Sequence, residues 1–210
     1  MARGASEPPA GIALLLIDFI NPFDFDGADL LLANALRAAR ATCKLCARAR
    51  AAGVPIVYVN DNFDAWHLGF RELVERFSAP GARGRDVVLL LRPDFERDHF
   101  VLKPMNSGFF RTPLEVLLQR LGTRKLVLTG IAGENCVLFT ANDAYLRGFE
   151  LLIPGDCTAS ERSVDNRNAL AHMQRVLKAD VRPSTHIELA PQRMQRRRRQ
   201  AQRAATRSGA

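Results

Sequence analysis

Five stretches of this chain consist mostly of consecutive apolar residues, and they alternate with segments of helical composition. A strand that is apolar at consecutive positions, rather than at every second one, is buried on both faces. Such strands, alternating with helices, predict an α/β fold in which a mainly parallel sheet is covered by helices on both faces. The expected strands lie at residues 11–19, 54–61, 99–104, 124–131 and 149–156.

Helices are expected at five places, four between these strands and one after the last of them. Segment 112–122 has the clearest boundaries, because Thr112 can cap its N-terminus, Pro113 fits its first turn and Gly122 fits its C-terminus. The run Val-Val-Leu-Leu-Leu at 87–91 is too short to distinguish a strand from a helix. The other expected helices lie at 29–52, within 63–81, at 135–148 and at 163–179, and segment 180–184 is expected to form a last short strand.

The net charge of +8 belongs almost entirely to the C-terminal end of the chain. Residues 191–210 carry seven arginines and no acidic residue, so the rest of the chain has a net charge of only about +1. A block of like charge without apolar periodicity predicts disorder. We expect a flexible N-terminus at 1–11, one domain at 12–190 and a disordered arginine-rich tail at 191–210. The tail has either no defined role or weak, salt-sensitive contacts with nucleic acid or an acidic surface.

The four cysteines are too few and too scattered for a secreted disulfide scaffold. No apolar run reaches the length of a membrane span, so we expect a soluble, cytoplasmic protein. Cys43 and Cys46 form a C-x-x-C pair within an expected helix, but no second pair accompanies them. We interpret these two, like Cys157, as packing residues.

Polar residues that follow the strands are the first candidates for a site, because ligands of a parallel sheet bind at the carboxyl ends of its strands. These residues are Asp18, Asn60 with Asp61, Lys103, and the turn 130–136 that contains Cys136. A nearby cation and the N-terminus of the following helix would lower the pKa of a thiol there. Asp18 could accept the proton of the thiol. The sequence therefore predicts a nucleophile, a base and an orienting cation at one edge of the sheet.

These residues lie in motifs that resemble the isochorismatase-like cysteine hydrolase family, which includes nicotinamidases and N-carbamoylsarcosine amidases. The motifs are "ALLLIDFINPF", "YVNDNFDAWHLGFRELV", "HFVLKPMNSGFFRTPLEVLLQRLG" and "LVLTGIAGENCVLFTANDAYLRGFELLIPGDCTAS". The resemblance covers about residues 12–189. It implies a three-layer, Rossmann-like α/β/α sandwich, a homo-oligomeric assembly, and a catalytic triad of Asp18, Lys103 and Cys136. It also implies an oxyanion hole from the N–H groups of Ala132 and Cys136 and a cis peptide bond between Ile131 and Ala132.

The pocket and a metal site are less clearly marked. Phe19, Asn60, Trp66 and Phe109 follow strand ends and are candidates either to line the pocket or to pack beneath the loops. Related nicotinamidases bind a metal through Asp-x-His and a further histidine, whereas this chain has Asp61, Asn62 and Phe63 in the corresponding places. Asp61 and His67 remain weak candidates and are too few for a metal site, so we expect no metal or other cofactor.

These features predict a metal-independent cysteine hydrolase that cleaves a small amide or ureide C–N bond through a thioester on Cys136. One alternative is an isochorismatase-type hydrolase that cleaves a vinyl ether by acid chemistry at Asp18. Another is a non-catalytic scaffold that acts through its basic C-terminal tail. The sequence does not identify the substrate, although loops 62–77 and 107–111 are expected to select it.

Overall fold

A computed structural model of the chain describes residues 11–189. The predicted parallel sheet is present and consists of β1 (Gly11–Ile17), β2 (Ile56–Asp61), β3 (His99–Lys103), β4 (Thr123–Ile131), β5 (Glu150–Leu152) and the short β6 (Thr158–Ala159). The strand order is β3-β2-β1-β4-β5, with β6 beside β4, and every pairing is parallel. The expected tails 1–11 and 191–210 lie outside the described residues, apart from Gly11, which begins β1.

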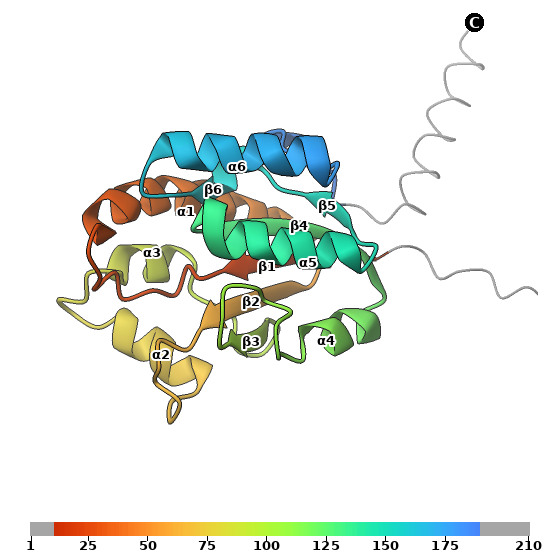
Figure 1. Cartoon of the computed structure of the whole chain (residues 1–210). Coiled ribbons are helices and arrows are strands. Elements are labelled where there is room, and N and C mark those ends of the chain that lie inside the picture. Colours follow the sequence, from red (N-terminus) through yellow and green to blue (C-terminus); the bar gives the residue numbers. More distant parts are fainter. Residues whose placement is uncertain (1–10, 190–210) are drawn as a thin grey trace, which may run out of the picture.

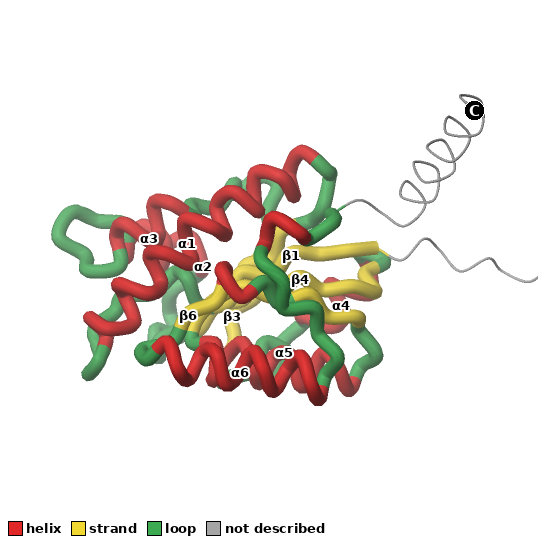
Figure 2. The backbone as a smooth tube through the Cα atoms, turned by 90° about the horizontal axis from the view of Figure 1, so that it is seen from above, coloured by secondary structure: helices red, strands yellow, loops and turns green. Residues whose placement is uncertain are grey.

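Helices cover both faces of this sheet, so the predicted three-layer α/β/α sandwich is confirmed (Figures 1 and 2). Figure 2 shows the strands between α1 and α3 on one side and α5 and α6 on the other. One face packs against α1 (Ala28–Ala51), α2 (Phe70–Phe77) and α3 (Arg85–Leu90), and the other against α4 (Leu114–Arg120), α5 (Leu138–Leu146) and α6 (Ser163–Val176). None of the described helices combines the length and apolar composition needed to cross a bilayer.

The central strand β1 shows why its sequence is apolar at consecutive positions. Leu14 and Leu16 belong to the core beneath α1, whereas Ala13, Leu15 and Ile17 belong to the core beneath α4 and α5. Successive side chains of a strand point to opposite faces, so a strand covered on both sides has no polar face. The two cores therefore fix the position of the carboxyl ends of the strands, where the polar residues lie.

Several element boundaries differ from the sequence prediction. The ambiguous run 87–91 falls largely within the helix α3. Segment 180–184 contains no strand, because Asp180 makes only an isolated bridge to Leu152. The helix expected at 135–148 begins earlier, as a π-helical turn η1 (Gly133–Val137) that continues into α5. The N-cap of α4 is Pro113 rather than the predicted Thr112, although Thr112 Oγ1 accepts a hydrogen bond from the Leu114 N–H at 3.2 Å.

Candidate active site

Asp18 follows β1 at the carboxyl edge of the sheet and is 5% exposed. Its φ of 53° is left-handed, a conformation that aspartate tolerates better than most residues. Its Oδ1 accepts a hydrogen bond from the Asp61 N–H at 2.7 Å, so the end of β2 fixes one carboxylate oxygen. The other oxygen, Oδ2, is thereby left to face the end of β3.

Lys103, the last residue of β3, occupies the position opposite that oxygen. Its Nζ lies 2.8 Å from Asp18 Oδ2 and 3.6 Å from Asp61 Oδ2, and its side chain is fully buried. Burial by itself would lower the pKa of Lys103, but Asp18, Cys136 and Asp61 together raise it above its ordinary value. Lys103 is therefore a protonated cation held by two carboxylates.

Cys136 completes a cluster of three side chains from three separate elements. Lys103 Nζ donates a hydrogen bond to Cys136 Sγ at 3.4 Å, and Cys136 itself is half-buried. Burial raises the pKa of Asp18 above its ordinary value, and Lys103 opposes this increase. Cys136 lowers the pKa of Asp18, and Asp18 raises the pKa of Cys136. The site therefore brings together a carboxylate, an ammonium and a thiol, with the ammonium in contact with both other groups.

The expectation that a nearby cation and a helix N-terminus lower the pKa of the Cys136 thiol is not supported. Burial, and next the negative charge of Asp18, raise the pKa of Cys136 well above that of a free thiol, and Lys103 only partly offsets them. The α-helix α5 begins only at Leu138. Cys136 therefore lies inside the preceding π-helical turn and not at the N-terminus of an α-helix. Cys136 is consequently a thiol at neutral pH, and its proton must be removed as it reacts.

The turn before Cys136 has a backbone that its glycines make possible. Gly130 has a φ of 139°, and a Cβ on it would lie 2.2 Å from the carbonyl oxygen of Ile17. The Ile131–Ala132 peptide bond, for which the resemblance implied a cis geometry, is cis. Among residues 11–189, the Ala132 N–H has no backbone acceptor, whereas the Ala132 carbonyl accepts from Asn135 and Val137. The Ala132 N–H, which has no backbone partner in this range, can therefore donate to a substrate oxygen.

A second set of residues, which the sequence did not point to, supports this turn. The Ser160 hydroxyl donates a hydrogen bond to Glu134 Oε2, which ties η1 to the segment after β6. Asn166 of α6 packs so closely on Gly133 that a Cβ there would lie 2.0 Å from its Oδ1. No sequence motif signals these contacts, because they depend on how α6 docks beside the turn.

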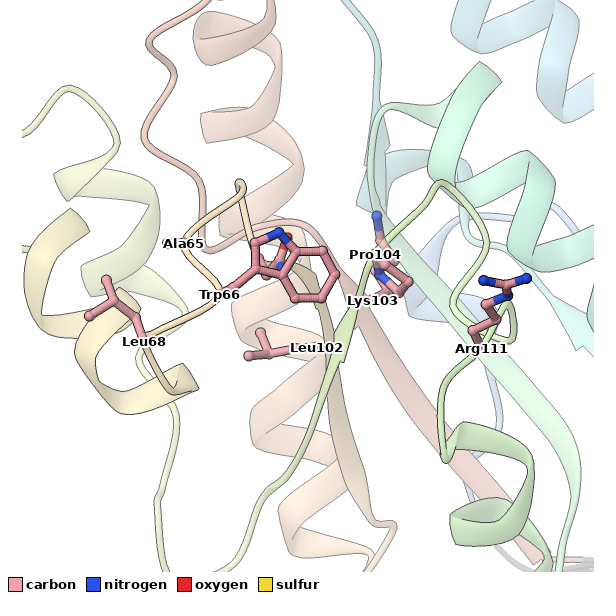
Figure 3. A pocket seen from close by; sticks show the side chains of 8 residues that line it. Ala65, Trp66, Leu68, Leu102, Lys103, Pro104 and Arg111 are labelled. Atoms are coloured by element: carbon pink, nitrogen blue, oxygen red, sulfur yellow. The ribbon is translucent and has the colours of Figure 1, made fainter.

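An open cavity of about 180 Å³ adjoins Lys103 (Figure 3). Trp66 lines it, as the sequence suggested, and is 71% exposed. Phe19 and Phe109 do not line it, because both are buried in the two cores. Asn60 does not line it either, since its side chain is fully buried and bonds to the backbone of Ile20 and Asp61. The lining residues are Asn62, Ala65, Trp66, Leu68, Leu102, Lys103, Pro104 and Arg111.

The two weak metal candidates do not form a ligand set. Asp61 is already engaged, because its Oδ1 accepts from the Phe63 N–H at 2.7 Å and its Oδ2 faces Lys103. His67 is exposed in the loop before α2. In the part of the chain from 11 to 189, no three His, Cys, Asp or Glu side chains are grouped so that they could hold a metal ion.

The fold and this cluster define an α/β/α enzyme whose polar groups gather at the carboxyl edge of a parallel sheet. The family model for the isochorismatase domain matches residues 12–184. The uncharacterized isochorismatase family protein YaaI of Bacillus subtilis is 37% identical, with 83% of this chain and 95% of that protein covered. This chain therefore belongs to the isochorismatase family, whose members are hydrolases.

Two further comparisons relate the chain to proteins with named activities. The ureidoacrylate amidohydrolase RutB of Methylorubrum extorquens is 31% identical, with 69% of this chain and 68% of that protein covered. The crystal structure of N-carbamoylsarcosine amidase from Thermoplasma acidophilum is 28% identical and superposes with a TM-score of 0.65, covering 85% of this chain and 99% of that one. Both relatives, by their names, act on C–N bonds.

Proposed function

We propose that this protein is a metal-independent cysteine hydrolase that cleaves a small amide or ureide C–N bond through a thioester on Cys136. The observation that carries the proposal is the position of Lys103 Nζ, 2.8 Å from Asp18 and 3.4 Å from the Cys136 sulfur. A buried ion pair contributes little to stability, so chemistry rather than folding accounts best for this one.

Acylation begins with the transfer of a proton. Asp18 takes the proton of the Cys136 thiol while the sulfur forms a bond to the carbonyl carbon of the substrate. The carbonyl electron pair moves onto the oxygen, which accepts hydrogen bonds from the N–H groups of Ala132 and Cys136. When this intermediate collapses, the C–N bond breaks and Asp18 gives the proton to the departing nitrogen. Lys103 stays protonated and keeps Asp18 able to act as a base.

Deacylation reverses these roles with water as the nucleophile. Asp18 accepts a proton from a water molecule as the water oxygen attacks the thioester carbon. The C–S bond then breaks, and the proton returns from Asp18 to the sulfur. The products are an amine or ammonia and a carboxylic or carbamic acid, and the site returns to its thiol form.

The substrate class is supported by the relatives and by the size of the cavity. The names ureidoacrylate amidohydrolase and N-carbamoylsarcosine amidase both describe hydrolysis of a carbonyl–nitrogen bond. A cavity of about 180 Å³ is smaller than the pockets that hold drug-sized ligands, so the substrate is small. The four free cysteines favour a reducing, cytoplasmic location, and we expect a homo-oligomer.

Replacing the nucleophile tests the proposal. Wild type and Cys136→Ala are assayed for ammonia release on a panel of amides and ureides, before and after dialysis against EDTA. We expect the variant to lose at least about 1,000-fold in kcat/KM with its circular dichroism unchanged, and EDTA to have no effect. Cys43→Ala, a half-buried cysteine of α1, is the matched control. Equal turnover by wild type and Cys136→Ala would exclude the thioester route.

Acid chemistry on a vinyl ether is the second candidate, and one observation favours it. Burial raises the pKa of Asp18, which makes its carboxyl group a better proton donor near neutral pH. In that case Cys136→Ala would retain turnover of a vinyl ether, whereas Asp18→Asn would lose it. The thioester route instead requires both residues.

A further inference from the structure

The cavity beside the reactive cluster has an uneven distribution of charge. Among the described residues that line it, only Lys103 and Arg111 are charged, and none is an aspartate or a glutamate. Lys103 is already neutralised by Asp18 at 2.8 Å and faces Asp61 as well. Arg111 therefore supplies the one positive charge of the cavity that an incoming molecule can use.

Arg111 has no acidic partner of its own. In the described part of the chain, no carboxylate lies within 4.0 Å of its guanidinium, whereas Arg147, on the neighbouring helix surface, is paired with both Glu115 and Asp143. The Arg111 guanidinium instead lies over the ring of Phe110, with 5.3 Å from its carbon to the ring centroid. An arginine that lines a cavity and pairs with nothing is available for a planar anion.

The loop that carries Arg111 is anchored on both sides. Before Arg111, the Ser107 hydroxyl donates to Asp143 at 2.5 Å and the Gly108 N–H donates to Thr140 at 2.9 Å, both on α5. After it, the Thr112 hydroxyl donates to the Gly108 carbonyl at 2.5 Å. These bonds fix the backbone of the loop, so the guanidinium is presented from a constant place rather than from a mobile segment.

Figure 3 shows Trp66 and Arg111 on opposite sides of Lys103. A small molecule in this cavity therefore meets the reactive cluster near Lys103, an apolar wall at Trp66 and a free guanidinium at Arg111. A substrate whose reacting carbonyl lies at the sulfur beside Lys103 can extend along Trp66 or toward Arg111, and of these two side chains only Arg111 carries a charge.

We propose that the substrate carries a carboxylate at the end remote from its reacting carbonyl, and that Arg111 binds this carboxylate. The inference rests on the proposed amide or ureide hydrolysis and makes it narrower: the substrate class is a small carboxylated ureide or amide. Arginine and a carboxylate form two parallel hydrogen bonds, which fix the orientation of the substrate as well as its affinity. Arg111 is then a substrate-binding residue that selects which amide is positioned for attack.

A pair of probes that differ in one negative charge and one methyl group tests the proposal. N-carbamoylglycine has the free carboxylate, and its methyl ester does not. Wild type should turn over the acid with a kcat/KM at least ten-fold above that of the ester. Arg111→Met, which keeps an unbranched apolar stem and removes the guanidinium, should lose ten-fold or more on the acid and less than two-fold on the ester. Arg111→Lys should fall between, because it keeps the charge and loses the second hydrogen bond.

The matched control is Arg71→Met. Arg71 also lies over a phenylalanine ring, that of Phe95 at 4.0 Å, but it does not line the cavity. This variant should keep the wild-type ratio of acid to ester. Equal losses on both probes in Arg111→Met, or an unchanged ratio, would overturn the role of Arg111 while leaving the hydrolase proposal intact.

A binding measurement separates failure of this inference from failure of the proposed function. Calorimetry with Cys136→Ala protein, which cannot form the thioester, should give at least ten-fold tighter binding of N-carbamoylglycine than of its ester. The Cys136→Ala, Arg111→Met double variant should lose that ratio. If wild type hydrolyses neither probe, ureide hydrolysis fails, and the binding ratio alone then decides whether Arg111 recognises a carboxylate.

Discussion

Lys103 and Asp18 form an ion pair of 2.8 Å in which neither side chain is more than 6% exposed. Removing two charges from water is costly, and the attraction between them seldom repays that cost. The pair is nevertheless placed against the sulfur of Cys136, which is 3.4 Å from the lysine. A charge pair in such a place controls where a proton resides, and two predictions test this control directly.

Lys103→Met should shift the acid limb of the pH–rate profile to higher pH. Asp18 acts as a base only when it is ionised, and the positive charge of Lys103 lowers its pKa against the effect of burial. Without the cation the pKa of Asp18 increases, so a larger fraction of the enzyme is protonated and inactive at any given pH. We expect kcat/KM near pH 7 to fall by at least about 100-fold. The profile of kcat/KM between pH 4 and 9 measures the shift.

The control for this prediction is Lys125→Met, which removes a lysine paired with Glu150 on the surface of the sheet edge. Its pH profile should match that of wild type. Thermal unfolding of both variants shows whether either has lost its fold, since breaking a buried ion pair costs about 3–5 kcal/mol. A folded Lys103→Met protein with an unshifted acid limb would contradict the assigned base.

Alkylation of Cys136 by iodoacetamide should be slow at neutral pH and increase with pH. Burial and the Asp18 carboxylate raise the pKa of this thiol, so the reactive thiolate fraction grows about ten-fold per pH unit. Mass spectrometry of the Cys136 peptide between pH 6.5 and 8.5 measures the rate. A rate that stays constant over this range would mean that a thiolate is already present at rest.

The sequence was sufficient to predict the cluster because it depends on positions that a parallel sheet constrains. Lys103 ends a strand, and Asp18 and Cys136 each follow one at the same edge, so the pattern of strands brings them together. The resting state of the sulfur could not be predicted in this way. It depends on how much solvent is removed around Cys136, and burial is a property of the packed structure.

The pocket residues were harder to predict for a related reason. Phe19 and Trp66 both follow strand ends, but only Trp66 lines the cavity. The left-handed backbone at Asp18, with a φ of 53°, redirects the chain so that Phe19 enters the core. Strand position identifies the edge of the sheet, whereas the direction of each side chain depends on dihedral angles that composition does not reveal.

Gly130→Ala should destabilise the protein by at least about 3 kcal/mol, because a Cβ would combine an unfavourable φ with a collision. The added atom would lie 2.2 Å from the Ile17 carbonyl oxygen, a backbone atom of the central strand that cannot move aside. Gly148→Ala is the matched control, since its φ of 78° is also left-handed but nothing lies within 4 Å of the added Cβ. The control should cost only about 1 kcal/mol in the free energy of unfolding, measured in urea. Equal costs at the two sites would refute the backbone collision.

Deleting residues 191–210 should separate hydrolysis from any contact made by the basic tail. The proposed catalytic cluster of Asp18, Lys103 and Cys136 lies wholly within 11–189, so the shortened protein should retain its kcat/KM within about two-fold. Seven positive charges are removed, so any binding to nucleic acid should weaken and lose its dependence on salt. Turnover assays measure the first effect. DNA binding between 50 and 300 mM salt measures the second, and any affinity of the full-length chain for DNA should change by about 10-fold or more over this range. Loss of hydrolysis on truncation would contradict this division.

Gly133→Ala should impair catalysis more than stability, and a second substitution should restore it. The added Cβ would lie 2.0 Å from Asn166 Oδ1, the end of a side chain that can move. The expected cost in the free energy of unfolding is therefore only about 1–2 kcal/mol. The turn, however, has to shift, and a displaced Ala132 N–H would stabilise the oxyanion less, so kcat should fall about 10- to 100-fold with KM little changed.

Asn166→Ala removes the obstructing oxygen, which is itself buried without a partner among the described residues. This substitution loses only a 3.3 Å hydrogen bond from the Asn166 side chain to the Thr158 carbonyl. The Gly133→Ala, Asn166→Ala double variant should therefore recover kcat to within about three-fold of Asn166→Ala alone, because the obstruction and not the methyl group displaces the turn. If the losses of the two single variants simply added, the position of this turn would not depend on the contact between Gly133 and Asn166.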